Sequence, residues 1–332
     1  MEFIKELIRF TLLILFTPIK IFLYISKSRL VYLDETRLGH FFGDSIPLIQ
    51  FGKYQFRWLI FPIVSPCSEF IASQIKKKQK IFIINSLLLK TVTGWFRNDK
   101  LIVYNLTNSL NYVHDRNLFK YFSKAPRYKF IDLDPNYLIS KDEIIQIRNQ
   151  FLKKYAINSD KILVFNHRSL IHNSPDQNIH RFRDFKKDTA DALISTASQN
   201  NLLIINLSDI FLEKSNIYNI KTNKNFVSDD IIFSLLTATH YVGDSTGTSV
   251  IAQLLGINSF LYNIFPKSFE VTNRDSVILP VFYKYNQDST VTNDFKVNQF
   301  NTTNEFLIHG VSLIPQSTSD TLIQFNKWLQ FK

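Results

Sequence analysis

The sequence contains very little cysteine. Cys67 is the only cysteine among 332 residues, so the chain cannot form an internal disulfide and has no cysteine cluster for structural zinc. A single cysteine fits a reducing compartment. The histidines outside the motifs described below do not have metal-ligand spacing; they are His114, His172, His180, His240 and His309. We therefore expect neither a metal ion nor a cofactor.

The common nucleotide-binding fingerprints are also missing. The sequence has neither the Gly-Lys-Ser/Thr of a P-loop nor the GxGxxG of a dinucleotide-binding turn. This absence disfavours kinase-type and dinucleotide-dependent enzymes. No RNP-like aromatic motif, zinc finger or helix-turn-helix accompanies the basic residues, and Lys76-Lys77-Lys78 is typical of the end of a solvated helix. We therefore do not expect nucleic acid as a partner.

Acidic residues are too few to balance the basic ones. The chain has 28 Asp and Glu residues against 39 Lys and Arg residues, which leaves a formal net charge of +11. Such a charge attracts an anionic partner. With nucleic acid disfavoured, an acidic bilayer and a phosphorylated substrate are the partner classes that the charge supports.

The apolar segment near the N-terminus is short and interrupted for a membrane-spanning helix. Residues 7–25 are mostly apolar, but Arg9, Pro18 and Lys20 interrupt them. The uncharged run 10–19 has ten residues, whereas a spanning helix needs about 20. No small-x-small cleavage site follows Ile25, which disfavours a cleaved signal peptide.

The basic residues around this segment favour a helix that lies in the headgroup region of a membrane, where basic side chains reach anionic phosphates. They are Lys5, Arg9, Lys20, Lys27 and Arg29. We therefore predict that residues 1–28 form a membrane-surface helix, which places the protein peripherally at the cytoplasmic face of the inner membrane. An apolar helix packed on the protein's own core and a true span remain the alternatives.

The length of the chain indicates two domains, because domains cluster near roughly 100 to 150 residues. We place an α/β domain at residues 29–157. Its strands are predicted at 30–33, 81–84 and 101–104, with helices around 66–78 and 86–96. A polar loop holding Arg37 to Asp44 follows the first strand. A capping-box spacing, Ser140 to Glu143, begins the helix that closes this domain.

Helices alternate with short apolar strands in the second half, which predicts a parallel, doubly wound sheet over residues 158–315. Strands are expected at 162–165, 202–206, 240–242 and 259–262, and helices at 186–199, 228–237 and 248–255. Gly256 occupies a helix-ending position. Residues 266–315 are predicted to be irregular, and a last helix in 316–332 is expected to return to the first domain. The fold class is therefore α/β, with two facing Rossmann-like domains, parallel sheets and an N-terminal apolar helix.

Parallel sheets bind ligands beyond the carboxyl ends of their strands, and polar residues gather there in this sequence. His167 and Arg168 follow the strand 162–165, and the guanidinium of an arginine matches phosphate oxygens in pairs. The strand 240–242 runs into a small-residue turn whose glycines, hydroxyls and helix-start amides suit a diphosphate. The residues of this turn are Asp244, Ser245, Thr246, Gly247 and Thr248.

The order of these motifs resembles a family of bacterial glycosyltransferases of the GT-B architecture. His167-Arg168 matches the family's His- and Arg-bearing motif, and Arg181 to Asp184 matches its Arg-rich stretch. The segment VGDSTGTSVIAQLLGINSFLYN matches the turn, helix and strand that follow. More distantly, the sequence is similar to lipopolysaccharide heptosyltransferases and to fucosyltransferases of that fold. Arg37-Leu38-Gly39-His40 resembles the family's Arg-Ile-Gly-His element on the acceptor side.

This resemblance implies transfer of a sugar from a nucleotide diphosphate to a hydroxyl of a glycan or lipid-linked acceptor in surface polysaccharide assembly. Arg168 and Arg183, together with the helix start at Thr248, would neutralise the leaving diphosphate without a metal ion. His40 or Asp44 would act as the base on the acceptor hydroxyl. Donor-side contacts are expected from His167, Arg168, Arg181, Arg183, Asp244, Ser245, Thr246, Gly247 and Thr248, and acceptor-side contacts from Arg37 and Gly39.

Two other functions remain open at the level of the sequence. The chain could be a catalytically inactive α/β protein that binds sugar phosphates or scaffolds an envelope complex. A phosphate-ester hydrolase would need a nucleophile beside a base, and neither Ser245 nor Ser249 has such a partner nearby in the sequence. Asp132-Leu133-Asp134 resembles the metal-binding Asp-x-Asp of another glycosyltransferase architecture, but Pro135 follows it directly and we interpret it as coincidence.

Overall fold

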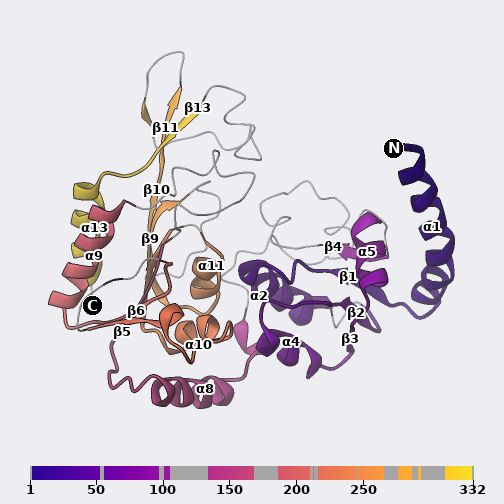
Figure 1. The fold of residues 1–332 in the computed structure, drawn as a ribbon, viewed down its shortest axis with the longest axis horizontal. Coiled ribbons are helices and arrows are strands. Elements are labelled where there is room, and N and C mark those ends of the chain that lie inside the picture. Colours follow the sequence, from indigo (N-terminus) through magenta and orange to yellow (C-terminus); the bar gives the residue numbers. More distant parts are fainter. Residues whose placement is uncertain are drawn as a thin grey trace. The chain divides into compact units, whose positions relative to one another are not determined.

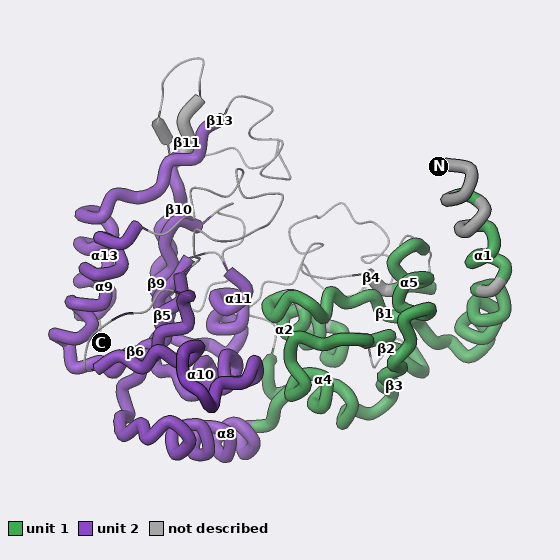
Figure 2. Tube along the Cα trace, viewed as in Figure 1, with its two compact units in different colours: residues 1–140 green, residues 141–332 purple. Residues whose placement is uncertain are grey.

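A computed structural model of the 332-residue chain describes residues 2–52, 56–96, 101–104, 134–167, 186–209, 212, 216–244, 246–264, 276–285, 291–292 and 311–330. The chain divides into two compact units, Met1–Ser140 and Lys141–Lys332 (Figure 2). This division comes earlier than the boundary expected at residue 157, because the helix that follows Ser140 packs within the second unit.

Unit 1 contains a four-stranded parallel sheet in the order β3-β2-β1-β4 (Figure 1). Leu30 of the central strand lies between Ile60 and Ile102 of its neighbours. The elements of unit 1 are α1 (Glu2–Ile25), β1 (Arg29–Tyr32), α2 (Leu38–Pro47), η1 (Leu48–Gly52), β2 (Leu59–Pro62), α4 (Glu69–Lys76), β3 (Ile81–Ile84), α5 (Leu87–Trp95), β4 (Ile102–Tyr104) and η3 (Pro135–Tyr137). The parallel sheet expected in this half is therefore present.

Helix α2 corrects one expectation. The segment Arg37 to Asp44 was predicted as a polar loop, but the chain is helical from Leu38 onward. Phe41, Phe42 and Ile46 are fully buried at helical spacing, and their burial stabilises the helix despite the polar residues between them. Asp44 is thereby carried into the interior, with no exposed surface.

Helix α1 packs against the sheet of unit 1 along one stripe of its surface. Phe16 and Leu23 are fully buried in a core cluster with residues of β1, α5 and β4, and Leu12 and Ile19 pack against the same cluster. The rings of Phe16 and Phe96 stack with centroids 5.7 Å apart. Among the described residues, no helix is long and apolar enough to cross a membrane.

Unit 2 contains the six-stranded parallel sheet that the sequence predicts, in the order β10-β9-β8-β5-β6-β7. Val164 of the central strand lies between Ile205 and Tyr241. Helices α9 and α13 lie side by side on one face, with α10 and α11 on the other (Figure 1). The elements are α8 (Lys141–Lys154), β5 (Ile162–Asn166), α9 (Lys187–Gln199), β6 (Leu203–Asn206), β7 (Ile217–Asn219), η5 (Ile220–Thr222), α10 (Asp230–Thr237), β8 (His240–Gly243), α11 (Gly247–Leu254), β9 (Asn258–Ile264), β10 (Val277–Pro280), β11 (Phe282–Tyr285), β12 (Val291–Thr292), β13 (Val311–Ile314) and α13 (Thr318–Gln330).

The region 266–315 is not entirely irregular as predicted. It contains β10, which extends the parallel sheet, and an antiparallel sheet in the order β12-β11-β13. These strands have two to four residues each. So few residues give too little alternation of apolar and polar side chains to stand out in a polar segment. Gly256 does end α11 as expected, with a φ of +69°.

Helices α8 and α13 both belong to unit 2. The Asp230 carboxylate of α10 accepts hydrogen bonds from Lys154 Nζ (2.6 Å) and Tyr155 Oη (2.7 Å) at the end of α8. Phe325 and Trp328 of α13 lie in the core of unit 2, and Trp328 Nε1 donates to Asn258 Oδ1 (2.8 Å). The aromatic face of α13 is therefore buried against β9, and the return of this helix to the first domain stays a prediction.

Candidate functional site

The topology of unit 2 defines one point where a ligand site is expected. The chain leaves β5 toward β6 and β7 on one side, and β8, β9 and β10 lie on the other side. The carboxyl ends of β5 and β8 therefore meet where the strand order reverses, which is where open α/β sheets bind ligands. Asn166 and His167 stand at the end of β5, and Asp244 and Thr246 follow β8. The structure thus brings the two predicted donor motifs to one edge of the sheet.

The two strands approach each other closely at Gly243, which pairs with Asn166. A Cβ atom at Gly243 would lie 2.5 Å from the carbonyl oxygen of Asn166 and 2.6 Å from the Tyr241 hydroxyl. Neither distance is compatible with a side chain. Glycine is therefore required here for the sheet to close beneath the turn.

A network of neutral polar groups holds the turn between β8 and α11. Asn166 Nδ2 donates to the hydroxyl of Thr248 (2.7 Å) and to that of Thr246 (3.2 Å). The Tyr241 hydroxyl lies 2.9 Å from that of Thr248, and the two threonine hydroxyls are 2.8 Å apart. The hydroxyls expected to contact a donor therefore also bond to β5 and β8. Asn166 and Tyr241 were missed because neither residue type marks a site by itself in a strand sequence.

The start of α11 is capped so that its backbone is well defined. The Ser249 hydroxyl accepts from the amide of Thr246 (3.1 Å) and donates to its carbonyl (2.7 Å). Amides in the first turn of a helix have no acceptor inside that helix, and they carry the positive end of its dipole. Thr246, Gly247 and Thr248 are all half-buried rather than enclosed in the core. An anion is the ligand that such a turn suits best.

His167 and Asp244 form a buried pair beside this network. His167 Nδ1 lies 3.6 Å from Asp244 Oδ2, and the two side chains are 1% and 0% exposed. The Tyr262 ring lies 5.6 Å from the imidazole. Burial raises the pKa of Tyr262 and of Tyr241, and the Asp244 carboxylate adds to both shifts. Both phenols therefore stay neutral beside the anion-suited turn.

Several predicted donor residues lie outside the described residues. They are Arg168, Arg181, Arg183 and Ser245. Asp132 also lies outside them, whereas Asp134 caps the short helix η3 by accepting from the amide of Asn136 (2.9 Å). Among the described residues, no three His, Cys, Asp or Glu side chains gather in a way that could hold a metal ion.

In unit 1 the strand order reverses between β1 and β4. The expected acceptor-side residues follow β1 in the chain: Arg37 is the exposed N-cap of α2, Gly39 is buried in its first turn, and His40 comes next. The side chain of His40 lies outside the described residues. Asp44, the other candidate base, is fully buried in the same helix.

A buried ion pair that the sequence did not reveal lies just after β1. Lys90 Nζ from α5 contacts Glu35 Oε2 and the carbonyl of Leu33, and it lies 4.7 Å from the centre of the Tyr32 ring. The side chains of Glu35 and Lys90 are 4% and 18% exposed. Residues 55 positions apart in the sequence form this pair, so no local pattern indicates it.

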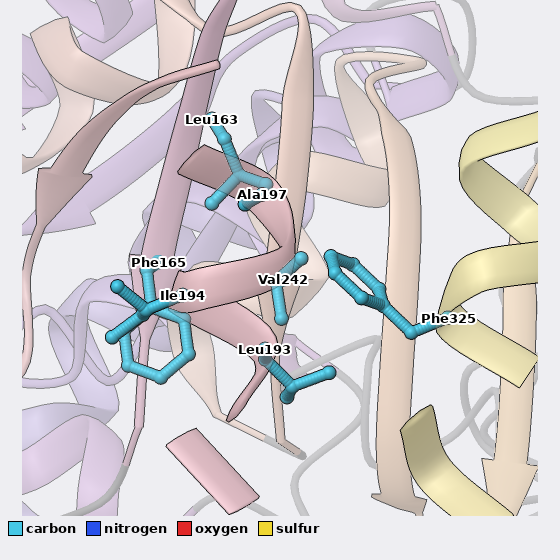
Figure 3. Close-up of a pocket in the computed structure, with 7 residues that line it drawn as sticks. All are labelled: Leu163, Phe165, Leu193, Ile194, Ala197, Val242 and Phe325. Carbon is cyan, nitrogen blue, oxygen red and sulfur yellow. The ribbon is translucent and has the colours of Figure 1, made fainter. Parts of the chain in front are cut away.

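One hollow in the core of unit 2 is not a candidate site. It lies between β5, β8, α9 and α13 (Figure 3), and only apolar side chains line it: Leu163, Phe165, Leu193, Ile194, Ala197, Val242 and Phe325. It offers no polar group to a phosphate or a sugar. We regard it as packing space in the core.

The fold and this sheet edge define an α/β protein with two parallel, Rossmann-like sheets, an architecture consistent with GT-B. No protein-family model and no curated protein matches the chain. Among solved structures, the chain is similar to the wall teichoic acid polymerase TagF, with a TM-score of 0.31 and 9% identity, over 82% of this chain and 68% of that one. A likeness at this level does not identify the function.

Proposed function

We propose that the chain is a glycosyltransferase that binds the diphosphate of a nucleotide-sugar donor at the edge formed by β5, β8 and α11. It transfers the sugar to a hydroxyl of a glycan or lipid-linked acceptor in surface polysaccharide assembly. The observation that supports this proposal is the position of the glycine- and threonine-bearing turn at the strand-order reversal of unit 2.

The chemistry of that edge suits a leaving diphosphate. The hydroxyls of Thr246 and Thr248 and the amides of the first turn of α11 are neutral donors beside a positive helix end. Their positions are fixed by Asn166 and Tyr241 before any ligand binds. Fixed donors stabilise the charge that develops as the sugar–phosphate bond breaks. In this proposal Arg168, Arg181 and Arg183 add the cationic charge that the described residues of the turn lack.

The base that takes the proton of the acceptor hydroxyl is assigned to His40. Asp44, the alternative, has no exposed surface, and a general base must come within hydrogen-bond reach of its substrate. His40 stands in the first turn of α2, which is the helix that follows β1. Replacing His40 by Ala should therefore abolish transfer and leave donor binding intact.

A pair of substitutions at Gly247 tests the donor site directly. Gly247 is the first residue of α11, and Thr246 before it has φ −125° and ψ 170°. This backbone accepts a following proline, and proline is favoured at the first helical position. Gly247→Pro therefore removes one amide donor while keeping the helix, whereas Gly247→Ala keeps the amide. Both variants and the wild type would be screened by thermal shift against UDP, GDP, CDP and their sugars.

We expect one nucleotide to raise the unfolding midpoint of the wild type and of Gly247→Ala, and to have little effect on Gly247→Pro. An equal rise in all three proteins would place the phosphates elsewhere. No rise with any diphosphate, in protein shown to be folded, would favour the scaffold alternative. Binding without sugar transfer to any acceptor would favour an inactive sugar-phosphate-binding protein.

A further inference from the structure

Helix α1 is apolar on two faces, but the described part of unit 1 covers only one of them. The buried stripe contains Leu12, Phe16, Ile19 and Leu23. On the other face, five large apolar side chains at helical spacing are between 55% and 74% exposed: Phe10, Ile14, Ile21, Phe22 and Ile25. A helix that is apolar all round is normally covered all round. The exposed stripe therefore indicates a partner with an apolar interior.

Basic side chains from three separate segments lie next to the end of this stripe. The turn after α1 leads into β1, and there the amide of Arg57 donates to the carbonyl of Lys27 (3.0 Å). One strand further, the amide of Leu59 donates to the carbonyl of Lys80 (2.9 Å). The amino ends of β1, β2 and β3 thus form one edge. We call its exposed basic residues the basic rim: Lys27, Arg57, Lys76, Lys77 and Lys80.

The segments that carry this rim, residues 20–29, 56–60 and 73–82, contain neither Asp nor Glu. An aromatic pair accompanies it: the rings of Trp58 and Phe82 lie 4.8 Å apart, and Phe82 is 48% exposed. Tryptophan and other aromatic side chains beside basic residues are typical of surfaces that meet lipid headgroups. The rim therefore matches an anionic surface, and the neighbouring stripe matches acyl chains.

We propose that the exposed stripe of α1 and the basic rim together form one docking surface for an anionic lipid bilayer. The stripe enters the boundary between headgroups and acyl chains, and the rim contacts lipid phosphates. The buried stripe fixes α1 to unit 1, so the helix docks as part of a folded unit. The rim is the new element, since the sequence alone points only to the helix and its flanking residues. This surface lies within unit 1 and does not depend on the donor site proposed in unit 2.

Vesicle sedimentation of the full chain, without nucleotide, tests this surface. The vesicles contain either phosphatidylglycerol mixed with phosphatidylcholine or phosphatidylcholine alone. The rim variant carries Arg57→Gln, Lys76→Gln and Lys77→Gln. Its matched control removes three exposed lysines of unit 2: Lys153→Gln, Lys186→Gln and Lys224→Gln. The stripe variant carries Ile14→Gln, Ile21→Gln and Phe22→Gln, and its control carries Ile145→Gln, Val227→Gln and Ile323→Gln, which are also exposed apolar positions.

We expect the wild type to bind the anionic vesicles and both controls to bind equally well. The rim variant should bind roughly a hundredfold more weakly, since each of the three basic residues that it removes contributes roughly fivefold near an anionic surface. The stripe variant should lose binding to the anionic vesicles. Equal binding by a variant and its control would overturn the part of the surface that the variant removes. If the wild type does not bind vesicles but forms dimers, and the stripe variant is monomeric, the bilayer proposal is overturned. A second copy of the chain would then cover the helix.

Discussion

The two parallel sheets end in different chemistry at the points where their strand order reverses. Beyond β5 and β8, neutral groups bond to one another around the start of a helix, and the carboxylate of Asp244 is paired with His167. Beyond β1, a buried carboxylate, Glu35, is fixed by Lys90. Each edge thus holds a buried carboxylate beside a basic side chain, but the edge of unit 2 adds the hydroxyls of Thr246 and Thr248 and the first amides of α11. This difference is our reason for assigning the donor to unit 2.

Glu35→Ala tests the ion pair beyond β1 in unit 1. Of the substitutions considered for this comparison, it should lower the free energy of unfolding most. It leaves Lys90 partly buried without its carboxylate partner, and breaking such a pair costs about 3 kcal/mol of unfolding free energy. Urea unfolding would be followed by the fluorescence of Trp58 and Trp95, which both lie in unit 1. The double variant Glu35→Leu/Lys90→Met should recover most of the loss. Wild-type stability in Glu35→Ala would mean that the pair contributes nothing to unit 1.

Gly243→Ala tests how closely β5 and β8 must approach in unit 2. The added Cβ would press on the carbonyl of Asn166 and on the Tyr241 hydroxyl, so we expect a loss of about 2 kcal/mol and a weaker thermal shift with nucleotide. Gly94→Ala in unit 1 is the matched control, because its Cβ would meet only the ring of Tyr32 at 3.3 Å. Calorimetry of the two variants should separate them. Equal stability would show that the β5–β8 edge tolerates a side chain.

Thr248→Val keeps the shape of the side chain and removes its hydroxyl from the network. Asn166 and Tyr241 keep the longer contacts to Thr246, at 3.2 and 3.4 Å. We expect a loss of about 1 kcal/mol, measured by urea unfolding, together with weaker nucleotide binding. The control is Thr91→Val in α5, whose exposed hydroxyl bonds only to the carbonyl of Leu87. A stable variant that still binds nucleotide would mean that the network does not position the turn.

Of these substitutions, Tyr262→Phe should change the free energy of unfolding least at neutral pH. Any change should be stabilising, whereas the other substitutions destabilise. Within the described residues the Tyr262 hydroxyl is buried without a hydrogen bond, so its removal should be neutral or stabilise by less than about 1 kcal/mol. Burial raises the pKa of this phenol, so the folded protein keeps the proton after the unfolded chain loses it. Stability should therefore fall as the pH rises above about 10.

The alkaline loss of stability should be smaller in Tyr262→Phe than in the wild type, which urea unfolding at pH 7 and above pH 10 would show. Tyr24→Phe, at an exposed position of α1, should behave like the wild type at both pH values. A loss that is equally steep in all three proteins would exclude Tyr262 as its cause.

Secondary structure was predicted from the sequence most accurately where strands and helices alternate over short distances. The strands near 162–165, 202–206 and 240–242 appear within one residue or two of their expected ends. There the apolar runs are buried on both faces and need no partner far away in the chain to be recognised. The turn before α11 was located for the same reason, since its glycine and hydroxyl residues follow directly on a strand.

The misses share one physical cause, which is burial decided by distant residues. Asp44 and His40 looked like loop residues because their polar neighbours outweighed Phe41 and Phe42, yet packing made the segment a helix. Helix α13 carries an aromatic face in its sequence, but only the structure shows that β9 is the surface it covers. The inward orientation of Thr246 and Thr248 depends on Asn166, which lies some 80 residues earlier. No local pattern contains that information.

Because α1 has one buried and one exposed apolar stripe, removing the whole helix would not make the protein easier to purify without detergent. Cutting the chain after Ile25 would remove the exposed apolar stripe, but it would also uncover the side chains that Phe16 and Leu23 now cover, among them Leu30, Val92 and Ile102. The shortened chain would therefore expose a new apolar surface in place of the old one. It would also lose the part of its core that Phe16 and Leu23 form. Polar substitutions on the exposed stripe alone should reduce aggregation and leave the core of unit 1 intact.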